Sequence, residues 1–204
     1  MMHALRLRLS REDGFSLIEM VAAMAVLAIL FAIYSLILSN TIRDSSTIED
    51  QSTAQTEVRA AVDGLAQDLR QAYTGDTTGS MYVVSAITGT TLSFYSPDRT
   101  TPFHLRQISY QLTGGKLQRQ YRTTTDTDGY PWVWGSWSAW ATVASNITSA
   151  SIFTGKYLDT SGNVVTTTTA SQVSGVWVAV TISPRGSQGR TYLYSTSASV
   201  RAAQ

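Results

Sequence analysis

Glu19 is the residue whose position most needs a chemical explanation. It places a carboxylate inside the run 15–38, in which only Ser16, Glu19 and Ser35 are clearly polar. A charge among apolar neighbours is costly unless it has a partner, so such a residue is a candidate functional group. The simpler alternative is that the side chain reaches back into the polar headgroup region, which a depth of about one helical turn allows.

Enzymatic chemistry has few candidate residues in this chain. Histidine occurs only at His3 and His104, and the neighbourhood of His104, TPFHLRQ, contains no acidic residue. The absence of cysteine excludes disulfide bonds, a thiol nucleophile and thiolate metal sites. The chain also lacks a G-x-S-x-G elbow, a phosphate-binding glycine loop and a histidine pair for a metal. We therefore expect no catalytic residues, no cofactor and no enzymatic activity.

The segment Asp126-Thr127-Asp128-Gly129 echoes the start of a calcium-binding loop. Such loops place a further acidic ligand downstream, but positions 130–140 contain neither Asp nor Glu. We expect a turn and no bound metal here, with a calcium site as the alternative.

Four tryptophans lie within nine residues, at Trp132, Trp134, Trp137 and Trp140. Trp132 and Trp134 share a face of an extended strand, whereas Trp137 falls on the other face unless a bulge at Gly135-Ser136 resets the alternation. Packing in the core or on the sheet is the favoured interpretation for large aromatic side chains. The alternative is an exposed interface for a partner subunit or a ligand, since tryptophan is enriched at binding hot spots.

The apolar run that contains Glu19 has the length of a membrane span. Its 24 residues would extend about 36 Å as a helix, enough to cross a hydrocarbon core of about 30 Å. Arg6, Arg8 and Arg11 precede it, which predicts a cytoplasmic N-terminus and an extracytoplasmic remainder. No small-residue cleavage site follows Leu38, so we expect the run to be retained.

The sequence Gly14-Phe15-Ser16-Leu17-Ile18-Glu19 resembles the processing site of type IV prepilins and pseudopilins. The resemblance implies that residues 1–14 are a leader peptide, which a prepilin peptidase removes by cutting between Gly14 and Phe15. It also implies N-methylation of Phe15 and an assembly role for Glu19. Residues 15 and 19 share a helix face, so Glu19 could pair with the new amine of its own chain or of a neighbour. The family favours the neighbour.

The rest of the chain predicts an α+β fold of the pilin type. Val58, Val62, Leu65 and Leu69 form an apolar stripe at helical spacing. We expect one helix over about 15–72, transmembrane at 15–38 and continuing through 39–72, which the Ser- and Thr-rich stretch 39–53 could loosen. Residues 73–204 then form a β-rich extracytoplasmic domain whose antiparallel sheet packs on the second half of the helix. Candidate strands are 81–87, 91–96, 106–113, 116–122, 147–153, 176–183 and 190–198, with a hairpin turn at Gly114-Gly115 and another hairpin joining the last two strands.

Several segments also resemble the J-type minor pseudopilin of type II secretion and its minor type IV pilin relatives: DLRQA at 68–72, ISYQLTGGKLQRQ at 108–120 and NITSASIFTGKYLDTSG at 146–162. This resemblance implies a minor subunit of a pseudopilus tip that works with other pseudopilins. The alternatives are a minor subunit of a type IV pilus or DNA-uptake machine, and a membrane-tethered periplasmic ligand-binding domain. A net charge of +1 predicts no nucleic-acid partner.

Overall fold

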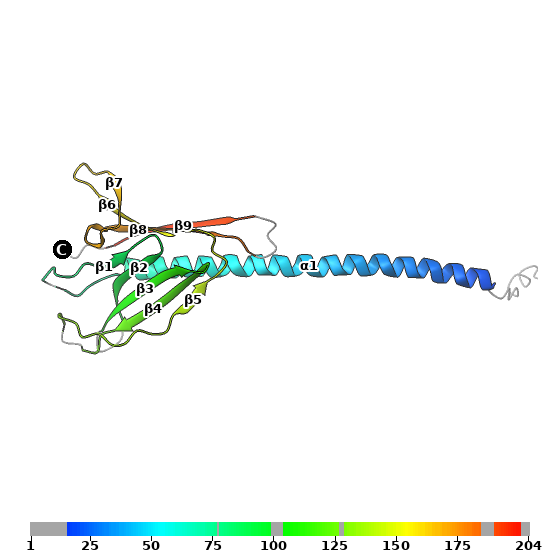
Figure 1. The fold of residues 1–204 in the computed structure, drawn as a ribbon, viewed down its shortest axis with the longest axis horizontal. Coiled ribbons are helices and arrows are strands. Elements are labelled where there is room, and N and C mark those ends of the chain that lie inside the picture. Colours follow the sequence, from blue (N-terminus) through cyan, green and yellow to red (C-terminus); the bar gives the residue numbers. More distant parts are fainter. Residues whose placement is uncertain (1–15, 77, 99–103, 127–128, 185–189, 201–204) are drawn as a thin grey trace, which may run out of the picture. The chain divides into compact units, whose positions relative to one another are not determined.

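A computed structural model of the chain describes residues 16–76, 78–98, 104–126, 129–184 and 190–200. Its first element is the helix α1, Leu17–Arg70 (Figure 1). The chain divides into two units, Met1–Ser46 and Thr47–Gln204, and α1 contributes residues to both.

α1 continues without interruption through 39–53, the stretch that the sequence indicated could be looser. Its hydroxyl side chains bond back to the preceding turn: Thr41 Oγ1 donates to the carbonyl of Ile37, and Ser46 Oγ to that of Arg43, both at 2.9 Å. Each of these two hydroxyls is satisfied inside the helix by sharing a backbone carbonyl, so it needs no partner outside the helix.

In the second unit the described residues form two antiparallel sheets. The five-stranded sheet has the order β1-β2-β3-β4-β5, and the four-stranded sheet has the order β7-β6-β8-β9. The strands are β1 Val84–Ile87, β2 Thr91–Pro97, β3 Leu105–Thr113, β4 Lys116–Thr123, β5 Ala141–Ala144, β6 Phe153–Leu158, β7 Val164–Thr167, β8 Gly175–Ile182 and β9 Tyr192–Ser199, with a short 3₁₀ helix, Ala170–Gln172, before β8.

The two predicted hairpins are present. β3 and β4 are joined by Gly114 and Gly115, whose φ angles of 55° and 70° suit a two-residue turn between twisted strands. β8 and β9 pair antiparallel over their full lengths.

Three strands differ from the expectation. β5 and β7 were not predicted, and the strand expected at 147–153 is replaced by β6, which begins only at Phe153. Before Phe153 the chain makes single contacts, including the bridge between Ile147 and Ile182 and the bond from the Ile152 N–H to the Gly89 carbonyl at 2.8 Å. β7 includes the start of the threonine-rich run. Its β-branched residues favour a strand, although apolar and polar residues do not alternate along it.

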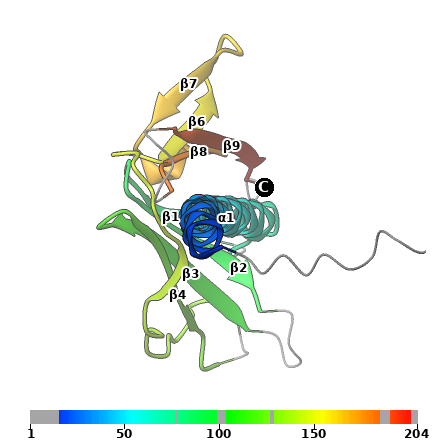
Figure 2. The same ribbon diagram turned by 90° about the vertical axis from the view of Figure 1, so that its right-hand side faces the viewer.

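The core lies where the Thr47–Arg70 part of α1 passes between the two sheets (Figure 2). The predicted stripe of Val58, Val62, Leu65 and Leu69 is buried there. The five-stranded sheet contributes Leu92, Phe94 and Ile108, and the four-stranded sheet contributes Val176, Val178, Val180 and Ile182, all buried. A long helix packed on antiparallel sheets confirms the predicted α+β, pilin-like fold.

Asp68, on α1, is hydrogen-bonded to two residues of the five-stranded sheet. Asp68 Oδ2 accepts a hydrogen bond from the Tyr110 hydroxyl at 3.2 Å and one from Arg119 Nη2 at 3.2 Å. The pKa of the Tyr110 phenol is raised above 10.0, first because the side chain is buried and then because the Asp68 carboxylate lies beside it. The folded state therefore favours the protonated phenol.

This raised pKa predicts a loss of stability in alkali. The contribution of Tyr110 is complete below about pH 10 and is lost as the pH rises from there toward the higher pKa of the folded state. We expect Tyr110→Phe to lower the free energy of unfolding by about 1 kcal/mol at neutral pH, because one hydrogen bond is lost. The variant should also lose less stability than the unmodified protein as the pH rises above about 10. Unfolding of the full chain in detergent micelles, followed across neutral and alkaline pH, measures both effects. Tyr82→Phe, at an exposed tyrosine, is the control, and an undiminished alkaline decline in Tyr110→Phe contradicts the assignment.

Candidate functional site

Glu19 lies in the first turn of α1, where it forms a reciprocal pair with Ser16. The Ser16 N–H donates to Glu19 Oε2 at 3.0 Å, and the Glu19 N–H donates to Ser16 Oγ at 3.3 Å. This is a capping box, in which two side chains satisfy amide groups that a helix start leaves without partners. Our reading of the sequence missed this role, although the signal, a serine followed three residues later by a glutamate, is present.

The capping box leaves part of the glutamate available. Oε2 is bonded to Ser16, whereas Oε1 has no hydrogen-bond partner among the described residues. Glu19 can therefore hold the helix start and still accept a second donor, such as an amine. Gly14 and Phe15, the predicted cleavage and methylation positions, lie outside the described residues.

The helix that follows Glu19 presents an apolar surface on every side. From Leu17 to Leu38 the large apolar side chains are 46–83% exposed, and this part of α1 is long and apolar enough to cross a membrane. An apolar surface of this extent is not stable in water, so lipid or other helices must cover it. The N-terminal part of the chain is thus a membrane anchor.

The first part of α1 lies inside a sequence motif of a known family. Residues 9–35 match the model of a protein family described as the prokaryotic N-terminal methylation motif. This motif indicates a type IV pilin-like protein. In such a pilin-like protein it implies processing by a prepilin peptidase and assembly with other pilins. No curated protein sequence matches the chain.

The other predicted site residues belong to the second unit, Thr47–Gln204. The carbonyl of His104 accepts the Asp98 N–H at 2.8 Å. Asp126 Oδ1 accepts the Val133 N–H at 3.1 Å, which ties the start of this loop to the tryptophan segment. Asp128 lies outside the described residues, so the calcium alternative stays untested. Within the described ranges, no cluster of three or more His, Asp or Glu side chains could hold a metal ion.

Asp76 is a buried carboxylate that holds the turn after α1 through hydrogen bonds. It accepts the N–H groups of Thr78 and Met81, both at 2.7 Å, and the Thr78 hydroxyl at 2.6 Å. These bonds, led by the one from the Thr78 side chain, lower the pKa of the Asp76 carboxyl. The group is ionised at neutral pH and organises the turn that follows α1.

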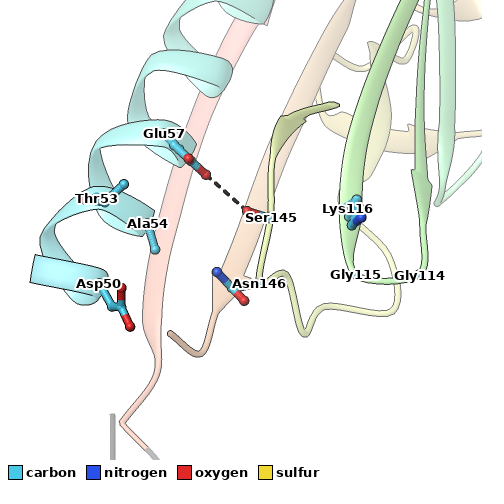
Figure 3. A pocket seen from close by; sticks show the side chains of 9 residues that line it. All are labelled: Asp50, Thr53, Ala54, Glu57, Gly114, Gly115, Lys116, Ser145 and Asn146. Carbon is cyan, nitrogen blue, oxygen red and sulfur yellow. Dashed lines mark hydrogen bonds between the residues drawn. The ribbon is translucent and has the colours of Figure 1, made fainter. Parts of the chain in front are cut away.

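A groove of about 490 Å³ lies between α1 and the β3–β4 turn (Figure 3). Asp50 and Glu57 line it from the helix and Lys116 from the strand side, and Ser145 Oγ donates to Glu57 Oε2 at 3.1 Å. The residues that line the groove are mostly polar and include no histidine.

The tryptophan segment runs along the outer edge of β4. The Gly135 N–H donates to the Thr123 carbonyl at 2.9 Å, and the Ser138 N–H donates to the Tyr121 carbonyl at 2.8 Å. Between these two bonds the tryptophan segment advances three residues and β4 advances two, which is a bulge. It lies next to Gly135-Ser136, where the sequence left open whether a bulge resets the alternation. Gly135 suits this approach because a Cβ there would stand 3.0 Å from the Thr123 oxygen.

None of the four tryptophans is buried, so the expected packing in the core is wrong, whereas the expected packing on the sheet holds for Trp134. The reason is the face that the segment occupies. Phe94 points into the core, so its neighbour Tyr95 points to the opposite face of the sheet. Trp134 stacks on Tyr95 with ring centroids 5.5 Å apart and therefore lies on that outer face. Trp132 is half-buried and donates its indole N–H to the Thr74 carbonyl at 3.0 Å.

Proposed function

We propose that this pilin-like protein is a non-enzymatic minor pseudopilin of the J type, assembled at the pseudopilus tip of a type II secretion system. The observation that carries the proposal is Glu19 at the start of an exposed apolar helix, inside the matched methylation motif. A simple membrane tether requires neither the glutamate nor the motif.

The proposed mechanism begins with hydrolysis of the Gly14–Phe15 peptide bond, which releases residues 1–14 and leaves an α-amine on Phe15. An amine with a pKa near 8 is a cation at neutral pH, and a methyl group does not remove its charge. In the filament, this cation on one subunit meets Glu19 Oε1 of its neighbour while Oε2 keeps the Ser16 N–H. Pairing the two charges lowers the cost of holding either one among apolar helices.

Two features support a minor rather than a major subunit. Removal of the leader leaves 190 of the 204 residues, more than most major pseudopilins have. The absence of cysteine rules out the disulfide loop of major pilins. In the proposed arrangement the N-terminus is cytoplasmic, α1 crosses the inner membrane once, and the β-rich domain is periplasmic or extracellular.

A minor subunit of a type IV pilus or DNA-uptake pilus is the second candidate, because the same motif serves both systems. Co-purification separates them: a type II secretion subunit should be recovered with the I- and K-type pseudopilins, and a pilus subunit with major pilin.

The mature N-terminus tests the proposal. In cells that contain a prepilin peptidase, we expect the chain to begin at Phe15 and to carry one methyl group on the Phe15 amine. The reason is that the motif implies cleavage of the Gly14–Phe15 bond and methylation of the new N-terminus. Intact-mass spectrometry of the protein purified from its native membrane measures this. The same chain made in cells without the peptidase is the control. A chain that still begins at Met1 or Met2 in the native membrane overturns the proposal.

A further inference from the structure

Arg122, on the outer face of the five-stranded sheet, is held in one position by its surroundings. Its guanidinium lies 4.9 Å from the ring centroid of Trp134 and 4.8 Å from that of Trp137. Its Nε donates to Gln107 Oε1 at 2.8 Å, and Gln107, only 8% exposed, donates in turn to Ser85 Oγ at 3.1 Å. The arginine therefore has little conformational freedom left to lose when it binds something.

The geometry determines what Arg122 can still bind. Trp134 and Trp137 occupy positions against the guanidinium, and its Nε is bonded, so the donors that remain are the Nη hydrogens. Among the described residues these have no hydrogen-bond partner. Two Nη groups in one plane match the two oxygens of a carboxylate, which an arginine binds through parallel hydrogen bonds.

The charges nearby favour one carboxylate over a polyanion. The two other arginines of β3 and β4 already have acidic partners, Arg106 with Asp98 at 3.7 Å and Arg119 with Asp68 at 3.2 Å. Arg122 has no carboxylate within 4.0 Å in the part of the chain that the structure describes. A nucleic acid requires several free cations in a row to neutralise its phosphates, whereas one free cation suits one acidic side chain.

The surroundings of Arg122 favour a protein as the source of that carboxylate. Trp137 and Trp140, on the same segment, remain 38% and 37% exposed. Exposed tryptophan beside arginine is the composition of protein-binding hot spots. Trp140 stacks on no described aromatic ring and leaves more than a third of its surface in solvent.

We propose that Arg122, braced by Trp134, Trp137 and Gln107, binds an Asp or Glu side chain of a protein partner, with Trp140 packing beside it. This contact does not depend on processing at Gly14, so it can fail or succeed independently of the proposed function.

Site-specific photo-crosslinking in the native host tests the proposal. With p-benzoylphenylalanine in place of Trp140, we expect an adduct to one protein whose crosslinked peptide contains Asp or Glu. Arg122→Gln should lower the adduct yield about tenfold or more, because a charge-assisted pair is lost. Arg122→Lys, which keeps the charge without the fork, should recover only part of it. The control places p-benzoylphenylalanine at Trp177, on the four-stranded sheet. Trp177 is 39% exposed, and its ring centroid lies 4.3 Å from the Lys156 amine.

A charge exchange separates binding from folding. Arg122→Glu should abolish the adduct, and replacing the partner's acidic residue by arginine should restore it, which a misfolded chain cannot do. An adduct that survives Arg122→Gln, one that forms equally at Trp177, or one made only with lipid or polysaccharide overturns the proposal. So does a saturable change in tryptophan fluorescence when the full chain in detergent is titrated with N-acetylglutamate at micromolar concentration, because the site would then serve a free carboxylate.

Discussion

Replacing Glu19 by leucine is expected to leave membrane insertion intact and to reduce incorporation into the filament about a hundredfold or more. Leucine is favourable at the start of a membrane helix, so insertion does not suffer. Assembly suffers because the cationic amine of a neighbouring subunit then enters the helix bundle without its partner. Leaving one member of a buried ion pair alone costs about 3–5 kcal/mol, and each 1.4 kcal/mol is a factor of ten.

The Glu19 experiment needs two further variants. Glu19→Gln keeps an oxygen for the Ser16 N–H but removes the charge, so it separates the capping box from the ion pair. We expect it to assemble nearly as poorly as Glu19→Leu. Glu49→Gln removes an acid farther along α1 and should assemble normally. The measurement is the share of each variant in purified filaments or tip complexes relative to the share in membranes. Full incorporation of Glu19→Leu would mean that residues 15–38 act only as a tether.

Replacing Leu65 by alanine is expected to lower the free energy of unfolding by about 2–5 kcal/mol. Leu65 is completely buried, on the face of α1 that packs between the two sheets. Its truncation removes buried apolar surface and leaves a cavity that neither sheet can fill without moving. A loss near the upper end of this range is comparable with the total stability of many domains.

Denaturant unfolding of the full chain in detergent micelles, followed by tryptophan fluorescence, measures the effect of Leu65→Ala. The matched control is Ile48→Ala on the same helix, where the side chain is 66% exposed, and its effect should be within about 0.5 kcal/mol. If both variants lost the same small amount of stability, the stripe would not be the centre of the core.

The parts of the fold that were predictable are those in which local chemistry and packing agree. The stripe from Val58 to Leu69 has helical spacing, and it is buried because a helix with that spacing has one face to cover. Gly114-Gly115 is a turn in the structure because only glycine adopts both positive φ angles without strain. β7 was missed because its threonines carry no alternation, and β5 because its four residues are defined by pairing with β4 alone.

The candidate sites were predictable to different degrees. The assembly role of Glu19 stays a prediction. Its bond with Ser16 was not predicted, although a serine followed three residues later by a glutamate is the pattern of a capping box. The tryptophans were recognised as a group, yet their burial was wrong, since no local rule states which face of a sheet a helix will cover. Arg122 was not singled out at all. Its environment is assembled from β3, β4 and the segment after Gly129, which are brought together only by the fold.

The two oxygens of the Glu19 carboxylate have different partners in the proposed assembly, the Ser16 N–H at Oε2 and a neighbour's amine at Oε1. In the proposed assembly, a subunit in the bilayer already has one carboxylate oxygen bonded by the Ser16 N–H before it meets a neighbour. A subunit that left the proposed filament would give up the contact at Oε1 and keep the one at Oε2.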